Sequence, residues 1–291
     1  TNDIASGRTL EITGPKEIYE NWIENGVTSQ HLVGVEYTII ATGFDVDEGQ
    51  VKIRIPEATL TDNSGNSSNA LEFMLYSCLK ATNTETSATS GFLGNTSIQR
   101  QNIESVTFES GLSKMISSTK WDVSAGNDGS IMAWYTGSGP YKVYIASNGP
   151  MISLPTNSIG FFAYIGYDAS CTATSVINNM DVVTSSGVTD MRYMFYYTGY
   201  QKMTELDLGD NFDTSSVNYS TSGWGSTQVS HMNNMFEYCG HNAMTTLHLG
   251  KSFKKIMGTY ARSWGGGTNS APSNFVSNTG KSGACTIYCP T

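Results

Sequence analysis

The chain has 291 residues and a formal net charge of −9, with 14% charged and 11% aromatic residues. It has no basic stripe, which disfavours nucleic acid and anionic membrane as partners. The aromatic content argues against a disordered chain, because so much apolar area is not left in water. No stretch reaches eighteen consecutive apolar residues, so we expect no membrane insertion.

Residues 1–78 have the pattern of a small β domain. Segments 35–43, 50–68 and 71–77 are rich in β-branched and aromatic residues and are separated by turn residues. The stretch IPEATLTDNSGN at 55–66 resembles the late-strand signature of bacterial immunoglobulin-like domains. This resemblance implies an immunoglobulin-like β-sandwich.

The middle of the chain predicts a linker followed by further strands. Residues 79–98 are rich in Thr and Ser, which is typical of a linker. Residues 103–108 predict a strand, and residues 131–147 predict a hairpin. Residues 177–182 fit one more strand.

An internal repeat is the strongest signal in the sequence, and it is clear at 188–215 and 229–256. VTDMRYMF followed by MTELDLGDNFDTS matches VSHMNNMF followed by MTTLHLGKSFKKI at one offset of 41 residues, without a gap. Leu206 and Leu208 alternate with polar residues, as in a half-buried strand. Four apolar residues have the spacing of one face of a short helix. They are Val188, Met191, Met194 and Phe195. Such a unit cannot bury its apolar side alone, so repeats are expected to stack as a solenoid.

The segment CTIYC at 285–289 predicts the strand of a following repeat. Its two cysteines, Cys285 and Cys289, would lie roughly 13 Å apart in a strand, which is too far for a disulfide. Five cysteines at irregular spacing also make no disulfide framework. We expect most of them to be small buried hydrophobic residues.

The joined pattern VTDMxxMF…LDLGxxFDTS at 188–215 resembles the BspA-like repeat of bacterial surface proteins, a variant of the leucine-rich repeat. Residues 121–135 and 141–149 are similar to the segment that often precedes those repeats. The resemblance covers roughly 95–291 and implies a solenoid over 99–291. The predicted fold is therefore mainly β with short helices, an immunoglobulin-like sandwich followed by a BspA-type solenoid. The resemblance also implies a surface-exposed, non-catalytic protein used for adhesion or protein contact.

A solenoid of this type displays one row of side chains on its strand face, which in leucine-rich-repeat proteins often binds ligands. The candidate ligand-binding residues of this row are Glu205, Asp207, Thr246, His248 and Tyr288, with Thr286 beside them. The alternative is a sheet surface that is merely solvated.

Both repeats carry an insertion, at 218–228 and at 259–274, in which the chain departs from the family pattern. Stacking would place the two insertions side by side. Each brings a Tyr and a Trp near glycines, which suits protein or glycan recognition. These residues are Tyr219 with Trp224, and Tyr260 with Trp264. Alternatively, the insertions fold down and cap the edge of the repeats.

No HExxH pair, GxSxG elbow or phosphate-binding glycine loop occurs in the sequence. The acidic and amide residues at 45–48 and 62–66 could bind calcium, but turns need the same residues. We therefore expect no enzyme activity, no cofactor and no metal site.

These observations predict an extracellular protein of a bacterial cell surface that is not an enzyme. Its expected role is adhesion, or interaction with a protein or glycan of a host or neighbouring cell. Three alternatives remain: a structural spacer, a phage or virion decoration protein, and a carbohydrate-binding accessory domain.

Overall fold

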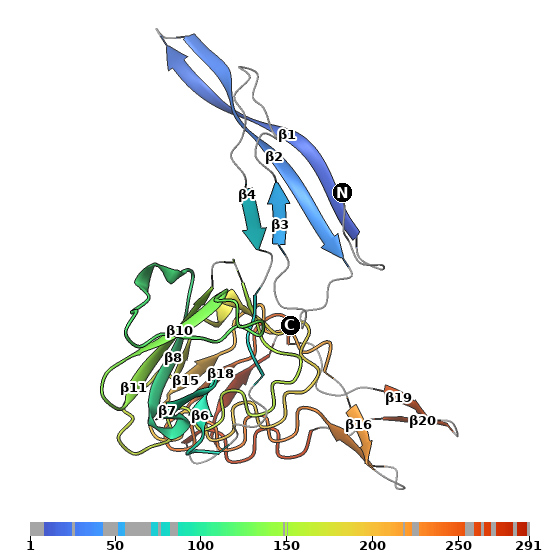
Figure 1. Cartoon of the computed structure of the whole chain (residues 1–291). Coiled ribbons are helices and arrows are strands. Elements are labelled where there is room, and N and C mark those ends of the chain that lie inside the picture. The colour runs from blue at the N-terminus through green and yellow to red at the C-terminus, as the bar shows by residue number, and fades with distance from the viewer. Residues whose placement is uncertain are drawn as a thin grey trace. The chain divides into compact units, whose positions relative to one another are not determined.

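A computed structural model gives the fold of the chain (Figure 1). The structure describes residues 9–24, 27–42, 52–55, 71–74, 77–81, 87–147, 149, 151–217, 219–222, 227–253, 259–262, 265–268, 272–281 and 284–289. The chain divides into two units, Thr1–Asp45 and Val46–Thr291. Both are built of strands. Among the described residues there is no α-helix, so none is long and apolar enough to cross a membrane.

The described part of the first unit is one long antiparallel hairpin. Strands β1 (Thr9–Glu24) and β2 (Val27–Thr42) pair along their length, from Thr9 opposite Thr42 to Glu24 opposite Val27. The predicted strand at 35–43 falls largely within β2. This hairpin confirms β structure near the amino end, and the immunoglobulin-like sandwich stays a prediction.

The second unit begins before the predicted domain boundary at residue 78. Strands β3 (Lys52–Ile55) and β4 (Leu71–Met74) pair antiparallel within it. Most of the IPEATLTDNSGN stretch and both calcium candidates, at 45–48 and 62–66, lie outside the described residues. The calcium alternative therefore stays a prediction.

A mixed sheet of five strands forms the first large layer of the second unit. Its spatial order is β13–β8–β11–β10–β9. The strands are β8 (Ile103–Glu109), β9 (Trp121–Asp122), β10 (Ile131–Thr136), β11 (Tyr141–Ser147) and β13 (Ile177–Asn178). The predicted strand at 103–108 and the predicted hairpin at 131–147 are confirmed as β8 and as the antiparallel pair β10–β11. Their alternating apolar side chains enter the core because successive residues of a strand point to opposite faces.

The residues predicted as a linker contribute to this core instead of lying outside it. Leu79, Phe92, Leu93 and Ile98 are almost fully buried. The ends of the Ser/Thr-rich segment are tied down by short strands, because their backbone and apolar side chains find partners there. These strands are β5 (Ser77–Cys78), which pairs in parallel with β12 (Ile152–Ser153) beside β14 (Val183–Thr184), and the pair β6 (Gly91–Phe92) with β7 (Asn95–Gln99).

The two repeats lie side by side through their strands. Strands β15 (Glu205–Asp207), β18 (Thr246–His248) and β21 (Thr286–Tyr288) form a three-stranded parallel sheet in that order. Leu206 pairs with Leu247, and Leu247 with Ile287. The sheet register thus reproduces the 41-residue offset of the sequence and places the segment at 285–289 next to the second repeat.

The short helix predicted around Val188–Phe195 is wrong, although its four apolar members are fully buried. Residues 192–202 form consecutive turns. We use the name turn ribbon for these turns and the equivalent turns of the neighbouring repeats. The N–H of Met191 and of Phe195 donate to carbonyls of the next repeat, at 2.7 and 2.8 Å, whereas the N–H of Met194 closes a turn on Met191 O. A helix cannot form because alternate N–H groups bond between repeats. The three helical segments described are single 3-10 turns, Arg100–Asn102, Leu112–Lys114 and Met180–Val182.

The final glycine of the LDLG and LHLG motifs lies where the backbones of the two repeats come closest. Gly250 has a φ of 71°, and a Cβ built on it would lie 1.9 Å from the carbonyl oxygen of Gly209. Gly250→Ala therefore has to push the repeats apart, and we expect a loss of roughly 2–4 kcal/mol in the free energy of unfolding. Urea denaturation measures it.

Gly126→Ala is the matched control for this substitution, because the added Cβ would meet only the end of the Asp128 side chain, at 3.1 Å. We expect a change below about 1 kcal/mol. Equal effects of the two substitutions would show that close approach at Gly250 does not set the spacing of the repeats.

The cysteines follow the sequence expectation in part. Cys78, Cys171 and Cys239 are buried, Cys285 is half-buried and Cys289 is exposed, and all five are free thiols. Burial raises the pKa of the Cys171 thiol to about 11 and also raises that of Cys239. The three buried thiols therefore act as small core residues.

Candidate functional site

The candidate site is the outer side of the parallel sheet β15–β18–β21, which we call the strand face. Leu206 and Leu247 point into the core and are fully buried, so their neighbours in each strand point outward. The outward residues are Glu205, Asp207, Thr246, His248, Thr286 and Tyr288. The sheet thus brings together in one row the six side chains that the sequence placed there.

Contacts between neighbouring repeats connect this row. His248 Nε2 lies 3.0 Å from Glu205 Oε1, and the His248 ring stacks on Tyr288 with centroids 4.6 Å apart and planes 7° apart. Asp207 Oδ1 accepts a hydrogen bond from the N–H of Gly209 at 2.9 Å. Tyr288 is 54% exposed. His248 therefore lies between the Glu205 carboxylate and the exposed ring of Tyr288.

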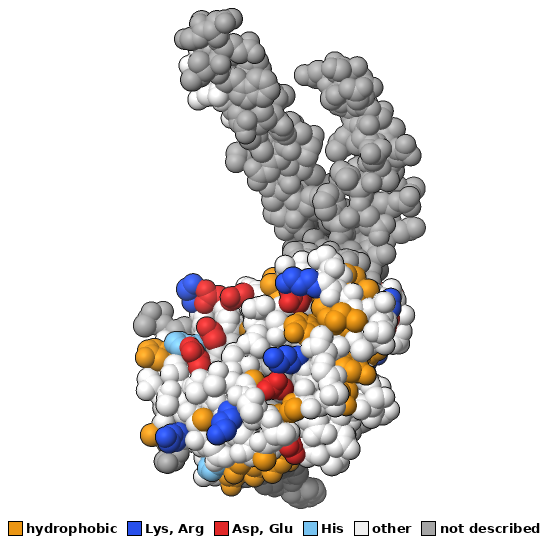
Figure 2. All heavy atoms as spheres, turned by 90° about the vertical axis from the view of Figure 1, so that its left-hand side faces the viewer, with side chains coloured by type: hydrophobic (Ala, Val, Ile, Leu, Met, Phe, Trp, Pro, Cys, Tyr) orange, Lys and Arg blue, Asp and Glu red, His pale blue; other side chains and the backbone are white. Residues whose placement is uncertain are grey.

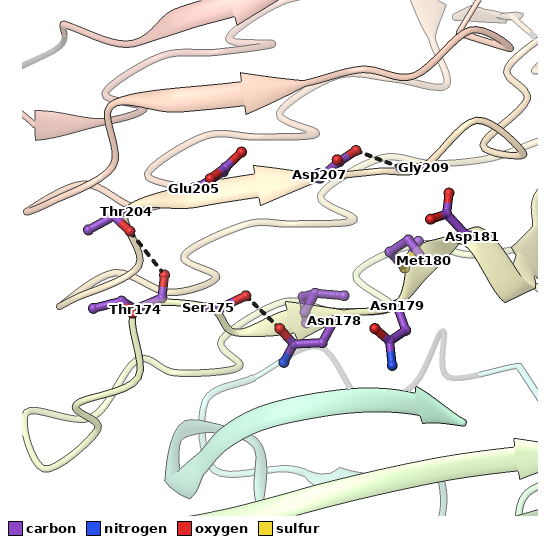
Figure 3. A pocket seen from close by; sticks show the side chains of 11 residues that line it. Thr174, Ser175, Asn178, Asn179, Met180, Asp181, Thr204, Glu205, Asp207 and Gly209 are labelled. Atoms are coloured by element: carbon purple, nitrogen blue, oxygen red, sulfur yellow. Dashed lines mark hydrogen bonds between the residues drawn. The ribbon is translucent and has the colours of Figure 1, made fainter. Parts of the chain in front are cut away.

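A groove of about 360 Å³ runs along the β15 side of the strand face (Figure 3). It opens where strand pairing is interrupted, because β13 and β15 belong to different sheets. At one end the N–H of Thr204 donates to Thr174 O at 3.0 Å, and beyond the other end Asn211 Nδ2 donates to Asp181 O at 2.7 Å. Both bonds hold the two segments in place while the groove stays open between them.

The lining of this groove is polar. Besides Ile177, Met180 and Gly209, it consists of hydroxyl, amide and carboxylate side chains. They are Thr174, Ser175, Asn178, Asn179, Asp181, Thr204, Glu205 and Asp207. No Lys or Arg is among these described lining residues. The groove therefore offers many hydrogen-bond acceptors and negative charge, which suits a neutral or cationic ligand and not an anion.

A second depression of about 220 Å³ continues from the first, since Asp207 lines both. It lies between His248, Tyr288 and the ion pair of Lys251 with Asp210. The hydrogen bond from Lys251 lowers the pKa of the Asp210 carboxyl, so both groups are charged at neutral pH. On the face shown in Figure 2, acidic side chains are interspersed with Lys and Arg, and several acidic ones lie close together at the upper left. Nowhere in the described part do His, Cys, Asp and Glu side chains form a group that could hold a metal ion.

The two insertions fold as antiparallel hairpins. Strand β16 (Tyr219–Ser222) pairs with β17 (Thr227–Ser230), and β19 (Thr259–Arg262) pairs with β20 (Gly265–Thr268). Trp224 and Trp264, and the side chains of Tyr219 and Tyr260, lie outside the described residues. Ligand binding by these aromatic side chains, and its alternative of capping the repeats, stay predictions.

Sequence reasoning missed a cluster of rings on the outside of the turn ribbon, which we call the tyrosine surface. Its members are Tyr164, Tyr167, Tyr193, Tyr196, Tyr197, Tyr200, Tyr238 and His241. A signal was present, because Phe-x-Tyr-x-Gly followed by Tyr or His occurs at 162–167, 195–200 and 236–241. The first spacing is 33 residues and the second is 41, which hides the first copy from a search at constant offset.

The chain was compared with protein-family models, with curated proteins and with solved structures, and nothing matches it.

Proposed function

We propose that this chain is a non-enzymatic, extracellular interaction module of a bacterial cell surface. In this proposal it consists of an immunoglobulin-like β domain followed by a BspA-like leucine-rich-repeat solenoid. It binds a protein or glycan of a host or neighbouring cell through the strand face. The observation that carries the proposal is the row of outward side chains from three adjacent strands, which leads into a polar groove.

The arrangement of the strand face supports recognition more than mere solvation. A solvated sheet needs neither a depression nor side chains that contact one another from strand to strand. Here the Glu205–His248 contact and the His248–Tyr288 stack hold three side chains in fixed positions. Preorganised polar groups beside an aromatic anchor reduce the entropy lost on binding.

Binding to an array of glycans and extracellular-matrix proteins tests the proposal. We expect a ligand whose affinity falls at least about tenfold in an Asp207→Asn, Tyr288→Ala variant, because one hydrogen bond to a charged group and one aromatic contact are lost. The matched control is Ile116→Ala, which removes an exposed apolar side chain elsewhere and should leave the affinity unchanged.

Other results of the same experiment distinguish the alternatives. Binding that survives in the strand-face variant but is lost in a Trp224→Ala, Trp264→Ala variant would contradict the strand face and assign recognition to the insertions. A chain that binds nothing on the array would favour the structural spacer. A hydrolytic activity that depends on Glu205 or Asp207 would overturn the non-enzymatic proposal.

A further inference from the structure

The tyrosine surface is an ordered set of rings from three adjacent turns. Tyr164 stacks on Tyr197 with centroids 5.4 Å and planes 3° apart, and Tyr197 stacks on Tyr238 at 4.5 Å and 8°. A second column places Tyr200 on His241 at 5.0 Å and 20°. Edge-to-face contacts, such as Tyr167 with Tyr197 at 5.5 Å and 87°, join the columns. The rings therefore make one continuous aromatic area.

The backbone is held in an unfavourable conformation to place these rings. Tyr164, Tyr197 and Tyr238 have φ values of 64°, 57° and 58°. A non-glycine residue in this left-handed region costs on the order of 1 kcal/mol. The N–H groups of the three residues donate to neighbouring turns at 2.9–3.1 Å, which fixes this conformation. The rings remain half-exposed, and Tyr193 is 41% exposed.

The charges around the tyrosine surface balance, in contrast to the rest of the protein. The turn segments 158–170, 189–203, 231–245 and 273–281 contain three acidic and three basic residues. Arg192 Nη2 pairs with Asp190 Oδ2 at 2.6 Å, and the Glu237 carboxylate accepts a hydrogen bond from Asn234 Nδ2 at 2.5 Å. A chain with a net charge of −9 repels its own copies, but this surface carries no excess of one sign.

We propose that the tyrosine surface is the interface through which two copies of this chain pair about a two-fold axis. A phenol both donates and accepts hydrogen bonds, so a surface of tyrosine hydroxyls and ring edges is complementary to itself, as a two-fold interface requires. Tyrosine is also enriched in protein interfaces. Tyr164 and Tyr238 stack on the Tyr197 ring at the centre of the surface, which reduces the ring area on which a sugar could stack.

Pairing would place two strand faces in one particle. That consequence rests on the proposed function, because only a ligand-binding strand face gains avidity from being doubled. The pairing itself does not depend on it, so the two proposals fail separately.

Sedimentation velocity of the whole chain under reducing conditions tests the pairing, with reductant present because Cys289 is exposed. We expect a dimer at about 10 µM that dissociates on dilution. A Tyr193→Asn, Tyr196→Ser variant should be monomeric at the same concentration, and Asn is chosen because it tolerates the left-handed region that Tyr193 occupies. The matched control, Tyr288→Asn on the strand face, should remain dimeric.

A wild-type chain that is monomeric at about 100 µM would overturn the proposal, and so would a folded double variant that dimerises like the wild type. Salt provides a measurement that needs no variant. Because the charges of the surface balance, the dimer should persist from low to high ionic strength, and dissociation by salt would contradict the proposed interface.

Discussion

Arg100→Met is expected to lower the free energy of unfolding of the second unit by roughly 3 kcal/mol, although Arg100 lies far from the strand face in the sequence. The side chain is fully buried. Its Nη1 lies 3.0 Å from each of three carbonyl oxygens, those of Gly160, Phe161 and Ala163. The guanidinium also lies 5.3 Å from the centroid of the Phe92 ring. Methionine fills similar space and donates nothing, so buried carbonyls lose a donor.

The position of Arg100 explains why the loss should be large. Phe161 and Ala163 precede Met194 and Tyr196 by 33 residues, and the carbonyls of Met194 and Tyr196 accept the N–H of Phe162 and Tyr164. Each turn of the ribbon thus receives hydrogen bonds from the turn before it. Arg100 donates to the first turn in place of a preceding one and so closes the beginning of the ribbon.

Urea denaturation followed by circular dichroism measures the effect of Arg100→Met. Lys114→Met is the matched control, because its ammonium group is largely exposed where it pairs with Glu109, and such pairs contribute about 1 kcal/mol or less. If the two variants lose equal stability, Arg100 does not close the ribbon.

Phe195→Ala is expected to cost about 3–5 kcal/mol of unfolding free energy, because the ring is fully buried in the middle of a column. Phe162 and Phe236 stack on its two faces, each with centroids 5.2 Å away. Alanine leaves a cavity between three adjacent turns that close-packed neighbours cannot fill. Thermal and urea denaturation of the purified variant give the difference.

Phe275→Ala tests whether this loss of stability comes from the place of Phe195 within the stacked column, or whether the deletion of any aromatic ring in this region costs as much. Phe275 is only partly buried and contacts Phe236 edge to face at 5.3 Å. We expect a loss clearly smaller than that of Phe195→Ala. Equal losses would mean that stacking through successive turns adds nothing beyond burial at one position.

Features that depend on local alternation and on the repeat could be predicted from the sequence. Leu206 and Leu247 indicated both the strand and its register, because side chains alternate and the offset is constant. The outward positions of Asp207 and His248 followed from the same alternation. These are properties of a few adjacent residues and one spacing.

Features that depend on hydrogen bonds between repeats could not be predicted in this way. The spacing of Met191, Met194 and Phe195 fits a helix as well as it fits consecutive turns, and the bond from Met191 N to His231 O decides between them. The apolar residues of the predicted linker, such as Leu79 and Phe92, were hidden among Ser and Thr. Their burial depends on strands far away in the sequence.

The groove was also beyond sequence reasoning. It exists because β13 continues one sheet while β15 begins another, and no residue type marks that interruption. Asn178 and Asp181 look like ordinary turn residues in the sequence. Their place beside Glu205 follows only from the way the two segments are held together at Thr174 and Asn211.

The most direct test of the strand face is hydrogen exchange of the intact chain, free and saturated with the ligand that the array identifies. Recognition through this face predicts slower exchange in residues 174–181, 204–210 and 245–251 on binding, because a bound ligand limits the opening and solvation of the amides it covers. The hairpins β16–β17 and β19–β20 should exchange as in the free chain. Protection confined to those hairpins, with unchanged exchange at β15 and β18, would contradict the central claim.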